Sequence, residues 1–284
     1  MVRPLKHGPA PFLVALGALA ACAHLPTARE RVLAENYYDQ GVLAMNADRP
    51  QEALKHFQDS VAQNPKLAPP YNGLGLLYWW SYGDAPKAKA EFEKALLLKP
   101  DFAEAANNLG TLLTELKDYA GAEKAYNRAL AEPLYQTPYV AQTNLGWLFH
   151  LQGHDAQAEQ QIRTALTAEP GYCVGHRQLA RLLEATGRQA EATAQWEKFA
   201  ALCPNDPQAL LHGAQLRVSQ GDDVGAARDL ETCLEKAGAQ PVARQCRRAL
   251  SKLPPLPPGA TLRPASQPAL GAVPGTRQLG AASP

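Results

Sequence analysis

The feature that most constrains this chain is an internal repeat. Small residues recur at steps of 34 to 36 positions, at Gly41, Gly75, Gly110, Gly146, Ala180 and Ala214. A second series of small residues runs in phase with the first, at Ala53, Ala88, Ala122, Ala158, Ala192 and Ala226. Four positions after each of these comes a bulky residue: Phe57, Phe92, Tyr126, Ile162, Trp196 and Leu230. A period of this length is typical of repeat architectures.

The pattern predicts two antiparallel helices in each unit. Helices approach closely only where a side chain is small, and a bulky side chain then fills the space against the next helix. A helix breaker closes each unit, at Pro65, Pro100, Pro133, Pro170, Pro204 and Gly238. The unit resembles the tetratricopeptide repeat. We therefore expect an all-α, right-handed superhelical solenoid of six repeats over 34–240, with a capping helix over 241–253.

Two repeats depart from the regular length. The second carries one extra residue between Tyr78 and Ala88, within the aromatic stretch "LYWWSYGD" at 77–84. The connection after the third repeat is two residues longer than the others. Pro133 and Pro138 predict that this connection is extended rather than helical.

The N-terminus has the pattern of an export signal. Arg3 and Lys6 precede the apolar run "PFLVALGALAAC", which is too short to span a membrane. The sequence "LAAC" at 19–22 resembles the lipobox of bacterial lipoproteins. That resemblance implies a signal peptide over 1–21, a diacylglycerol and an N-acyl chain on Cys22, and a lipidated linker over 22–33. Because Ala23 rather than Asp follows, it also implies outer-membrane sorting; an ordinary signal peptide with an incidental Cys is the alternative.

The C-terminal segment differs in composition from the repeats. Residues 254–284 contain eight Pro and only two charged side chains, Arg263 and Arg277. No amphipathic period persists there, so we expect a disordered Pro-, Ala- and Gly-rich tail.

The overall charge argues against a nucleic-acid partner. The 284 residues have a formal net charge of +1, so no basic excess is available to neutralise phosphates. A local cluster of Arg244, Arg247, Arg248 and Lys252 is expected to be the solvated face of the capping helix.

The sequence also has no pattern typical of an enzyme. It contains no phosphate-binding Gly loop and no nucleophile elbow. His150 and His154 are four residues apart, but Gly153 lies between them at an expected helix end and no third metal ligand is apparent. We expect no enzymatic activity, no metal, no small-molecule substrate, and no cofactor other than the lipid on Cys22.

Four further cysteines would be exported with the chain: Cys173, Cys203, Cys233 and Cys246. Cys173 opens the first helix of the fifth repeat and Cys203 follows its second helix, so an antiparallel pair brings them together. Cys233 and Cys246 lie at similar heights on neighbouring helices. The spacing favours disulfides Cys173–Cys203 and Cys233–Cys246; free buried thiols are the alternative.

A superhelix of such repeats has a concave face lined by the first helices. Positions three before, just after, and four to five places after the small residue of each first helix are expected to be exposed there. In the N-terminal half these positions are apolar, and we expect a partner-binding groove formed by Tyr38, Val42, Met45, Leu76, Trp79, Trp80 and Trp147. In the fifth and sixth repeats the stripe becomes polar. Packing of some of these side chains within the superhelix is the alternative.

Together, the lipobox, the six repeats and the segment "TPYVAQTNLGW" resemble the type IV pilus pilotin family (Tgl, PilF, PilW). The resemblance implies an outer-membrane lipoprotein that faces the periplasm and binds the secretin subunit during pore assembly. The long Pro-rich tail is not expected of that family. An outer-membrane adaptor that scaffolds peptidoglycan enzymes or barrel-assembly components is the alternative function.

Overall fold

The chain forms a solenoid of helices. A computed structural model describes residues 25–238 and 240–255, and in these ranges it has thirteen α-helices and no strand. The helices are α1 (Ala28–Asn46), α2 (Pro50–Gln63), α3 (Pro69–Trp80), α4 (Ala85–Leu98), α5 (Ala103–Glu115), α6 (Tyr119–Leu130), α7 (Pro138–Leu151), α8 (Asp155–Ala168), α9 (Cys173–Ala185), α10 (Gln189–Leu202), α11 (Pro207–Ser219), α12 (Asp223–Ala237) and α13 (Pro241–Leu250). The expected signal peptide, Cys22 and residues 256–284 of the expected tail all lie outside the described residues.

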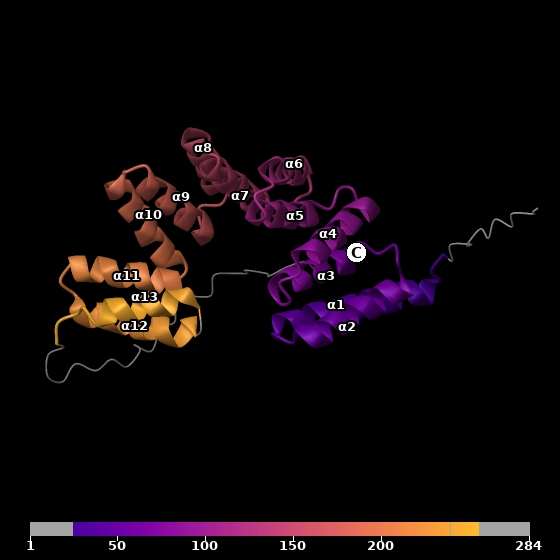
Figure 1. The fold of residues 1–284 in the computed structure, drawn as a ribbon, viewed down its shortest axis with the longest axis horizontal. Coiled ribbons are helices and arrows are strands. Elements are labelled where there is room, and N and C mark those ends of the chain that lie inside the picture. Colours follow the sequence, from indigo (N-terminus) through magenta and orange to yellow (C-terminus); the bar gives the residue numbers. More distant parts are fainter. Residues whose placement is uncertain (1–24, 239, 256–284) are drawn as a thin grey trace, which may run out of the picture.

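The helices pair as the repeat predicts. The most extensive contacts join α1 to α2, α3 to α4, and so on to α11 and α12, which gives six helical pairs. Helix α13 then packs on both α11 and α12. Its Val242, Ala243 and Cys246 are buried, whereas Arg244 and its basic neighbours are exposed. The predicted six-repeat solenoid with a capping helix is confirmed, and Figure 1 shows it as an arch of helices from α1 to α13.

Small residues allow the close approach of paired helices. A Cβ atom on Gly75 of α3 would lie 2.5 Å from Cε1 of Phe92 on α4. Phe92 is fully buried, so its ring occupies the space that the missing side chain leaves. Gly41 and Phe57 have the same relationship in the first repeat. This contact explains why the two residue series run in phase through the sequence.

The first helix begins earlier than expected. We expected a linker over 22–33, but α1 starts at Ala28. The side chain of Thr27 accepts a hydrogen bond from the backbone N–H of Glu30, and the Glu30 carboxylate accepts one from the backbone N–H of Thr27. This capping box satisfies donors that a helix N-terminus would otherwise leave unpaired. The Thr-x-x-Glu spacing is a sequence signal for that start.

Both irregular connections lie between helices. The turn from α3 to α4 spans four residues, Ser81–Asp84, and the backbone N–H of Asp84 bonds to the carbonyl oxygen of Tyr78. The segment from Ala131 to Thr137 joins α6 to α7 without helix, and Pro138 opens α7. The extra residues therefore lengthen connections and leave the helix pairs intact.

The solenoid curves toward its first helices. Helix α1 contacts α3, and the same holds for α3 and α5, α5 and α7, and α7 and α9. Within the described residues no contact joins consecutive second helices such as α2 and α4. In a curved stack, neighbouring helices lie closer together on the inner side than on the outer side. In the described residues the first helices contact one another and the second helices do not, so the first helices line the concave face. The backbones of α9 and α11 lie farther apart than those of the other neighbouring first helices, and a hydrogen bond of 3.4 Å from Arg177 to Gln208 joins the two helices.

Candidate partner-binding face

Two adjacent indoles end α3 and have different surroundings. The side chain of Trp80 is 63% exposed. Trp79 is half-buried, lies edge-on to Phe92 with ring centroids 6.5 Å apart, and donates from Nε1 to Oε2 of Glu115 at 2.8 Å. Because the two rings lie 5.6 Å apart, Trp79 supports Trp80 from one side. Trp80 is thus a large, supported and accessible aromatic side chain.

Leu76 is not part of an exposed patch. We expected it on the groove surface, but it is only 5% exposed. It belongs to the same buried cluster as Leu109 and Leu113 of α5. The expectation was wrong because the first helix of the next repeat covers this position.

The three groove residues expected in α1 are half-buried. Tyr38, Val42 and Met45 pack against a buried cluster that includes Phe57. Burial raises the pKa of the Tyr38 hydroxyl, and the carboxylates of Asp39 and then Glu104 raise it further. Since Glu104 is in α5, this hydroxyl faces along the row of first helices. These residues offer partial surfaces, and their role in binding a partner stays a prediction.

Trp147 carries a cation on its ring. This half-buried residue of α7 lies with its ring centroid 4.2 Å from Cζ of Arg181 on α9, and 4.9 Å from the ring of His150. A guanidinium on an indole face is a favourable cation–π contact. Sequence reasoning placed Trp147 on the concave stripe but did not predict this contact.

A ladder of amides crosses the first helices and was missed by sequence reasoning. Asn108 donates from Nδ2 to Oδ1 of Asn72 at 3.0 Å. Asn144 donates in the same way to Asn107, also at 3.0 Å. Asn72, Asn108 and Asn144 are 36 residues apart in the sequence, which is the signal that could have shown the ladder. It fixes the rotation of one repeat relative to the next.

Three tyrosines lie near the starts of α7 and α9: Tyr135 lies in the connection before α7, Tyr139 in α7 itself, and Tyr172 just before α9. Tyr135 is buried, and desolvation raises the pKa of its hydroxyl to about 12. Tyr139 lies edge-on to Tyr172 with ring centroids 4.9 Å apart, and burial raises the pKa of Tyr172 to about 12 as well. The hydroxyls of Tyr135 and Tyr172 therefore remain protonated at physiological pH and serve as neutral polar groups.

The structure joins the remaining cysteines in two pairs. Cys173 is bonded to Cys203 with Cα atoms 6.0 Å apart, and Cys233 to Cys246 with Cα atoms 6.3 Å apart. Both separations lie within the range that a disulfide spans. The first pair closes the fifth repeat on itself, and the second fixes α13 to α12. These are the pairs that the helix geometry favours.

The part of the chain that the structure describes has no group of three metal-ligating side chains. His150 Nδ1 instead lies 2.6 Å from Oδ1 of Asp155, and His154 is exposed.

No helix in the described ranges is long and apolar enough to cross a bilayer.

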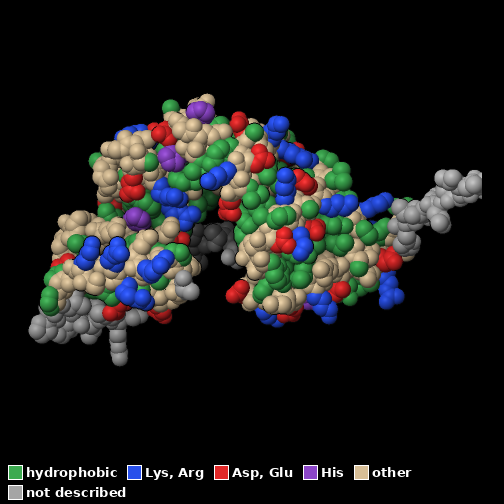
Figure 2. Space-filling view, in the orientation of Figure 1, with side chains coloured by type: hydrophobic (Ala, Val, Ile, Leu, Met, Phe, Trp, Pro, Cys, Tyr) green, Lys and Arg blue, Asp and Glu red, His purple; other side chains and the backbone are tan. Residues whose placement is uncertain are grey.

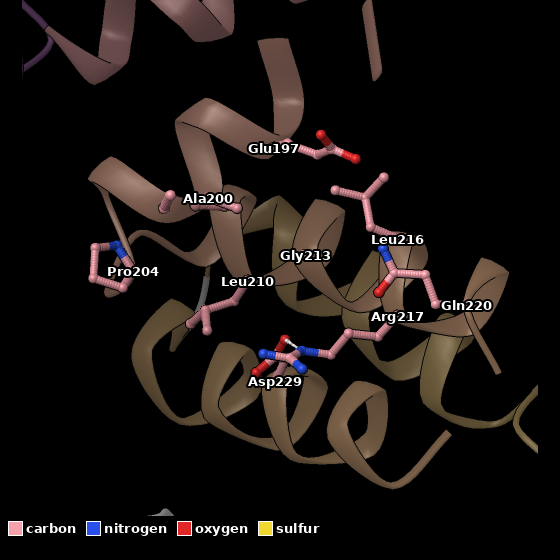
Figure 3. A pocket seen from close by; sticks show the side chains of 11 residues that line it. Glu197, Ala200, Pro204, Leu210, Gly213, Leu216, Arg217, Gln220 and Asp229 are labelled. Atoms are coloured by element: carbon pink, nitrogen blue, oxygen red, sulfur yellow. Dashed lines mark hydrogen bonds and ion pairs between the residues drawn. The ribbon is translucent and has the colours of Figure 1, made fainter. Parts of the chain in front are cut away.

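One hollow of the described residues is lined by a single cation, Arg217, and this cation is paired. It has a volume of about 350 Å³ and lies among α10, α11 and α12, as Figure 3 shows. Arg217 on its wall donates from Nε to Asp229 at 2.8 Å and pairs with Asp222 at 3.0 Å. Its guanidinium is therefore neutralised within the chain, and the concave row of first helices remains the stronger candidate for recognition.

Comparisons with known proteins agree with this architecture. Residues 80–137 and 174–216 each match a tetratricopeptide-repeat family model. These two segments are therefore tetratricopeptide repeats, and the other helical pairs of the described residues have the same form. Such repeats generally serve as non-catalytic scaffolds for protein interactions.

Curated relatives match over limited segments. The uncharacterized protein ycf37 of Pyropia yezoensis is 32% identical over 100 residues, or 34% of this chain and 53% of that protein. A probable biofilm formation methyltransferase, WspC of Pseudomonas putida, is 38% identical over 84 residues, or 30% of this chain and 20% of that protein. The chain spans about half or less of the length of these relatives.

Similar solved structures cover more of the chain. PilW, described as a widely conserved type IV pilus biogenesis factor, is 24% identical with a TM-score of 0.61, and the match covers 75% of this chain and 97% of PilW. PilF of Pseudomonas aeruginosa is 20% identical with the same TM-score, over 78% and 99% of the two chains. A repeat protein from Parabacteroides merdae is 18% identical with a TM-score of 0.62, over 77% and 84%. At these identities the likeness shows a shared fold.

Proposed function

We propose that this protein is a lipid-anchored pilotin that binds the secretin subunit of a type IV pilus machine at the outer membrane, on the periplasmic side. The lipobox-like sequence ending at Cys22 supports the anchor. The repeat scaffold and the likeness to PilW and PilF support a role in pilus biogenesis.

The observation that carries the proposal is the exposed indole of Trp80. A tryptophan held in place by its neighbours loses little conformational entropy on binding, and such residues commonly dominate interface energies. In this proposal the concave face covers apolar surface on a secretin subunit until subunits associate. The lipid on Cys22 keeps the protein beside the membrane where that assembly takes place, and no bond is made or broken.

Recovery of bound proteins tests this function. Full-length tagged protein is purified in mild detergent from the cells that produce it, as wild type, Trp80→Ala and Leu97→Ala. Leu97 is a matched control because it is 73% exposed but lies on α4, a second helix. We expect secretin with the wild type and the Leu97 variant, and much less with Trp80→Ala. No secretin with the wild type would contradict the proposal, and recovery of peptidoglycan enzymes or barrel-assembly components instead would favour the adaptor function.

A further inference from the structure

Basic side chains are unevenly distributed along the chain. Residues 28–238, which include α1 to α12, contain 20 Lys and Arg against 27 Asp and Glu. Residues 241–284 contain six Lys and Arg and no Asp or Glu. The near-neutral total therefore combines an acidic repeat array with a basic C-terminal segment. Charge asymmetry of this kind within one chain is typical of proteins that contact an anionic surface.

Four of these six cations lie on the outer side of α13 and in the turn that follows it. They are exposed and are spaced three or four positions apart, which places them on one side of the helix: Arg244, Arg247, Arg248 and Lys252. We call these four side chains the basic face. The opposite side of α13 packs in one cluster with Leu211 of α11 and Leu230 of α12, and the disulfide between Cys233 and Cys246 joins it to α12. The basic face is therefore held in a fixed position on the solenoid.

The basic face is not neutralised within the described chain. In residues 25–238 and 240–255, none of its four side chains forms a salt bridge or a hydrogen bond. Arg217 of α11, by comparison, pairs with Asp222 at 3.0 Å and with Asp229 at 2.8 Å. In Figure 2 basic side chains gather over α13, at one foot of the arch. Like charges at these spacings repel one another, so an anionic surface would be stabilising there.

The shape of the basic face indicates the class of partner. None of its side chains lines either of two hollows, among α8–α10 and among α10–α12, and small ligands usually occupy such concave sites. Within residues 241–255 no large apolar side chain is exposed, whereas a protein interface usually has an apolar or aromatic centre. A purely basic face instead suits the many phosphate groups of an anionic membrane, which attract clustered cations without a shaped pocket.

We propose that the basic face binds the anionic phospholipid headgroups of a bilayer. The inference goes beyond the proposed pilotin function, because it adds a second membrane attachment to the lipid expected on Cys22 and requires no secretin. Cys22 precedes α1 by six residues, so the lipid would hold the start of α1 within about 20 Å of the bilayer.

Two separate attachments would restrict how the arch lies on the membrane. In Figure 1 α1 and α13 form the two feet of the arch. A lipid joined through a short linker leaves the arch free to turn about one foot. Once the lipid is inserted, contact at α13 becomes intramolecular, so a weak attraction is enough to hold the second foot. Pairs of weak signals, such as an acyl chain with a basic patch, commonly give stable membrane attachment. The concave face would then be presented in one orientation.

Sedimentation with vesicles tests the basic face without the lipid. The sample is the oxidised mature chain, residues 22–284, with Cys22→Ser, so that neither a signal peptide nor an acyl chain contributes. Vesicles contain phosphatidylcholine alone, or phosphatidylcholine with about one quarter phosphatidylglycerol. We expect binding to the anionic vesicles, little binding to the neutral ones, and release in about 0.5 M salt, because salt screens exposed charges. Equal binding to both kinds of vesicle, or binding that persists in that salt, would overturn the proposal.

Matched variants locate the contact. Replacing all four residues of the basic face by Gln should weaken binding to anionic vesicles by about tenfold or more. The control removes the same charge from exposed positions of α2, α4, α6 and α10 and should change binding by less than about twofold: Lys55→Gln, Lys94→Gln, Lys124→Gln and Lys198→Gln. Equal weakening by the two sets would show that the contact lies elsewhere.

A charge-preserving variant separates diffuse attraction from a shaped arginine site. Arg244→Lys, Arg247→Lys and Arg248→Lys together should bind anionic vesicles as the wild type does, since Lys retains the charge but not the planar fork of Arg. Loss of binding in this variant, with helical circular dichroism unchanged, would contradict attraction to a membrane surface.

Two further comparisons distinguish the partner and the proposals. If insoluble peptidoglycan sediments the wild type more strongly than anionic vesicles do, and the Gln variant of the basic face loses that binding, the partner is the cell wall and the membrane proposal is wrong. Recovery of secretin without vesicle binding means that only this inference fails. Vesicle binding by the basic face without recovery of secretin means that the proposed function fails alone.

Discussion

The indole nitrogen of Trp79 donates a 2.8 Å hydrogen bond to the carboxylate of Glu115, which joins the end of α3 to the end of α5. Trp79 therefore has a structural role between two repeats. Its neighbour Trp80 has no such bond in the described chain and is largely exposed. The two adjacent indoles therefore differ: Trp79 packs between two repeats, whereas Trp80 presents an exposed aromatic surface.

This difference predicts that two similar substitutions change the free energy of unfolding by unequal amounts. Trp79→Ala should lower the free energy of unfolding by about 2 kcal/mol, because it removes packing against Phe92 as well as the hydrogen bond. Trp80→Ala should change it by less than about 0.5 kcal/mol, as an exposed substitution does. Urea unfolding followed by circular dichroism measures both. A larger loss for Trp80→Ala would mean that Trp80 belongs to the core.

The disulfides predict which cysteines resist alkylation. Mass mapping of unreduced exported protein should recover Cys173 linked to Cys203 and Cys233 linked to Cys246. Replacing Cys233 and Cys246 together by Ser should lower stability by about 3 kcal/mol, since the bridge restricts the unfolded chain. Four alkylated thiols in the unreduced protein would refute both pairs.

The contact of Gly75 with Phe92 predicts that a second substitution at Phe92 can restore stability lost by a substitution at Gly75. Gly75→Ala should destabilise by about 1–3 kcal/mol because the new Cβ meets the buried ring. Adding Phe92→Leu should recover part of that loss, as the smaller side chain leaves room. A double-mutant cycle from urea unfolding measures the coupling. Simple additivity of the two losses would show that the clash is relieved elsewhere.

His212 predicts acid sensitivity of the C-terminal repeats. Its ring stacks on Trp196 at 3.5 Å, and burial lowers its pKa below the ordinary value, against the opposing effects of Glu184 and of a hydrogen bond to Gln215. The unfolded chain therefore binds the proton first, and stability falls as the pH drops below about 6.5 toward the lowered folded pKa. His212→Gln should reduce this acid-dependent loss, whereas His154→Gln, at an exposed position, should behave as the wild type. Identical pH profiles for the wild type and His212→Gln would contradict the assignment.

Much of the fold was predictable because the repeat is a local pattern. The in-phase small and bulky residues determine which helices pair, and the same register brings Cys173 near Cys203. What the register leaves open is the rotation between repeats. Leu76 was placed on the surface because one repeat taken alone exposes it, yet the neighbouring helix α5 covers it.

Contacts between repeats were the least predictable part of the candidate site. Trp79 with Glu115 and Trp147 with Arg181 are separated by 36 and 34 residues, about one repeat. Each depends on how far one helix pair turns against the next. The sequence marks Trp79 and Trp147 as groove positions but does not identify the residues that they contact.

The most direct test of the proposed function is the assembly state of the secretin in cells that lack this protein. Secretin multimers that resist denaturing detergent are detected by immunoblot in the deletion strain, and in strains that carry wild-type or Cys22→Ser protein. We predict that multimers are lost on deletion, restored by the wild type, and reduced or misplaced with Cys22→Ser. Normal amounts of correctly placed multimers in the deletion strain would contradict the pilotin function.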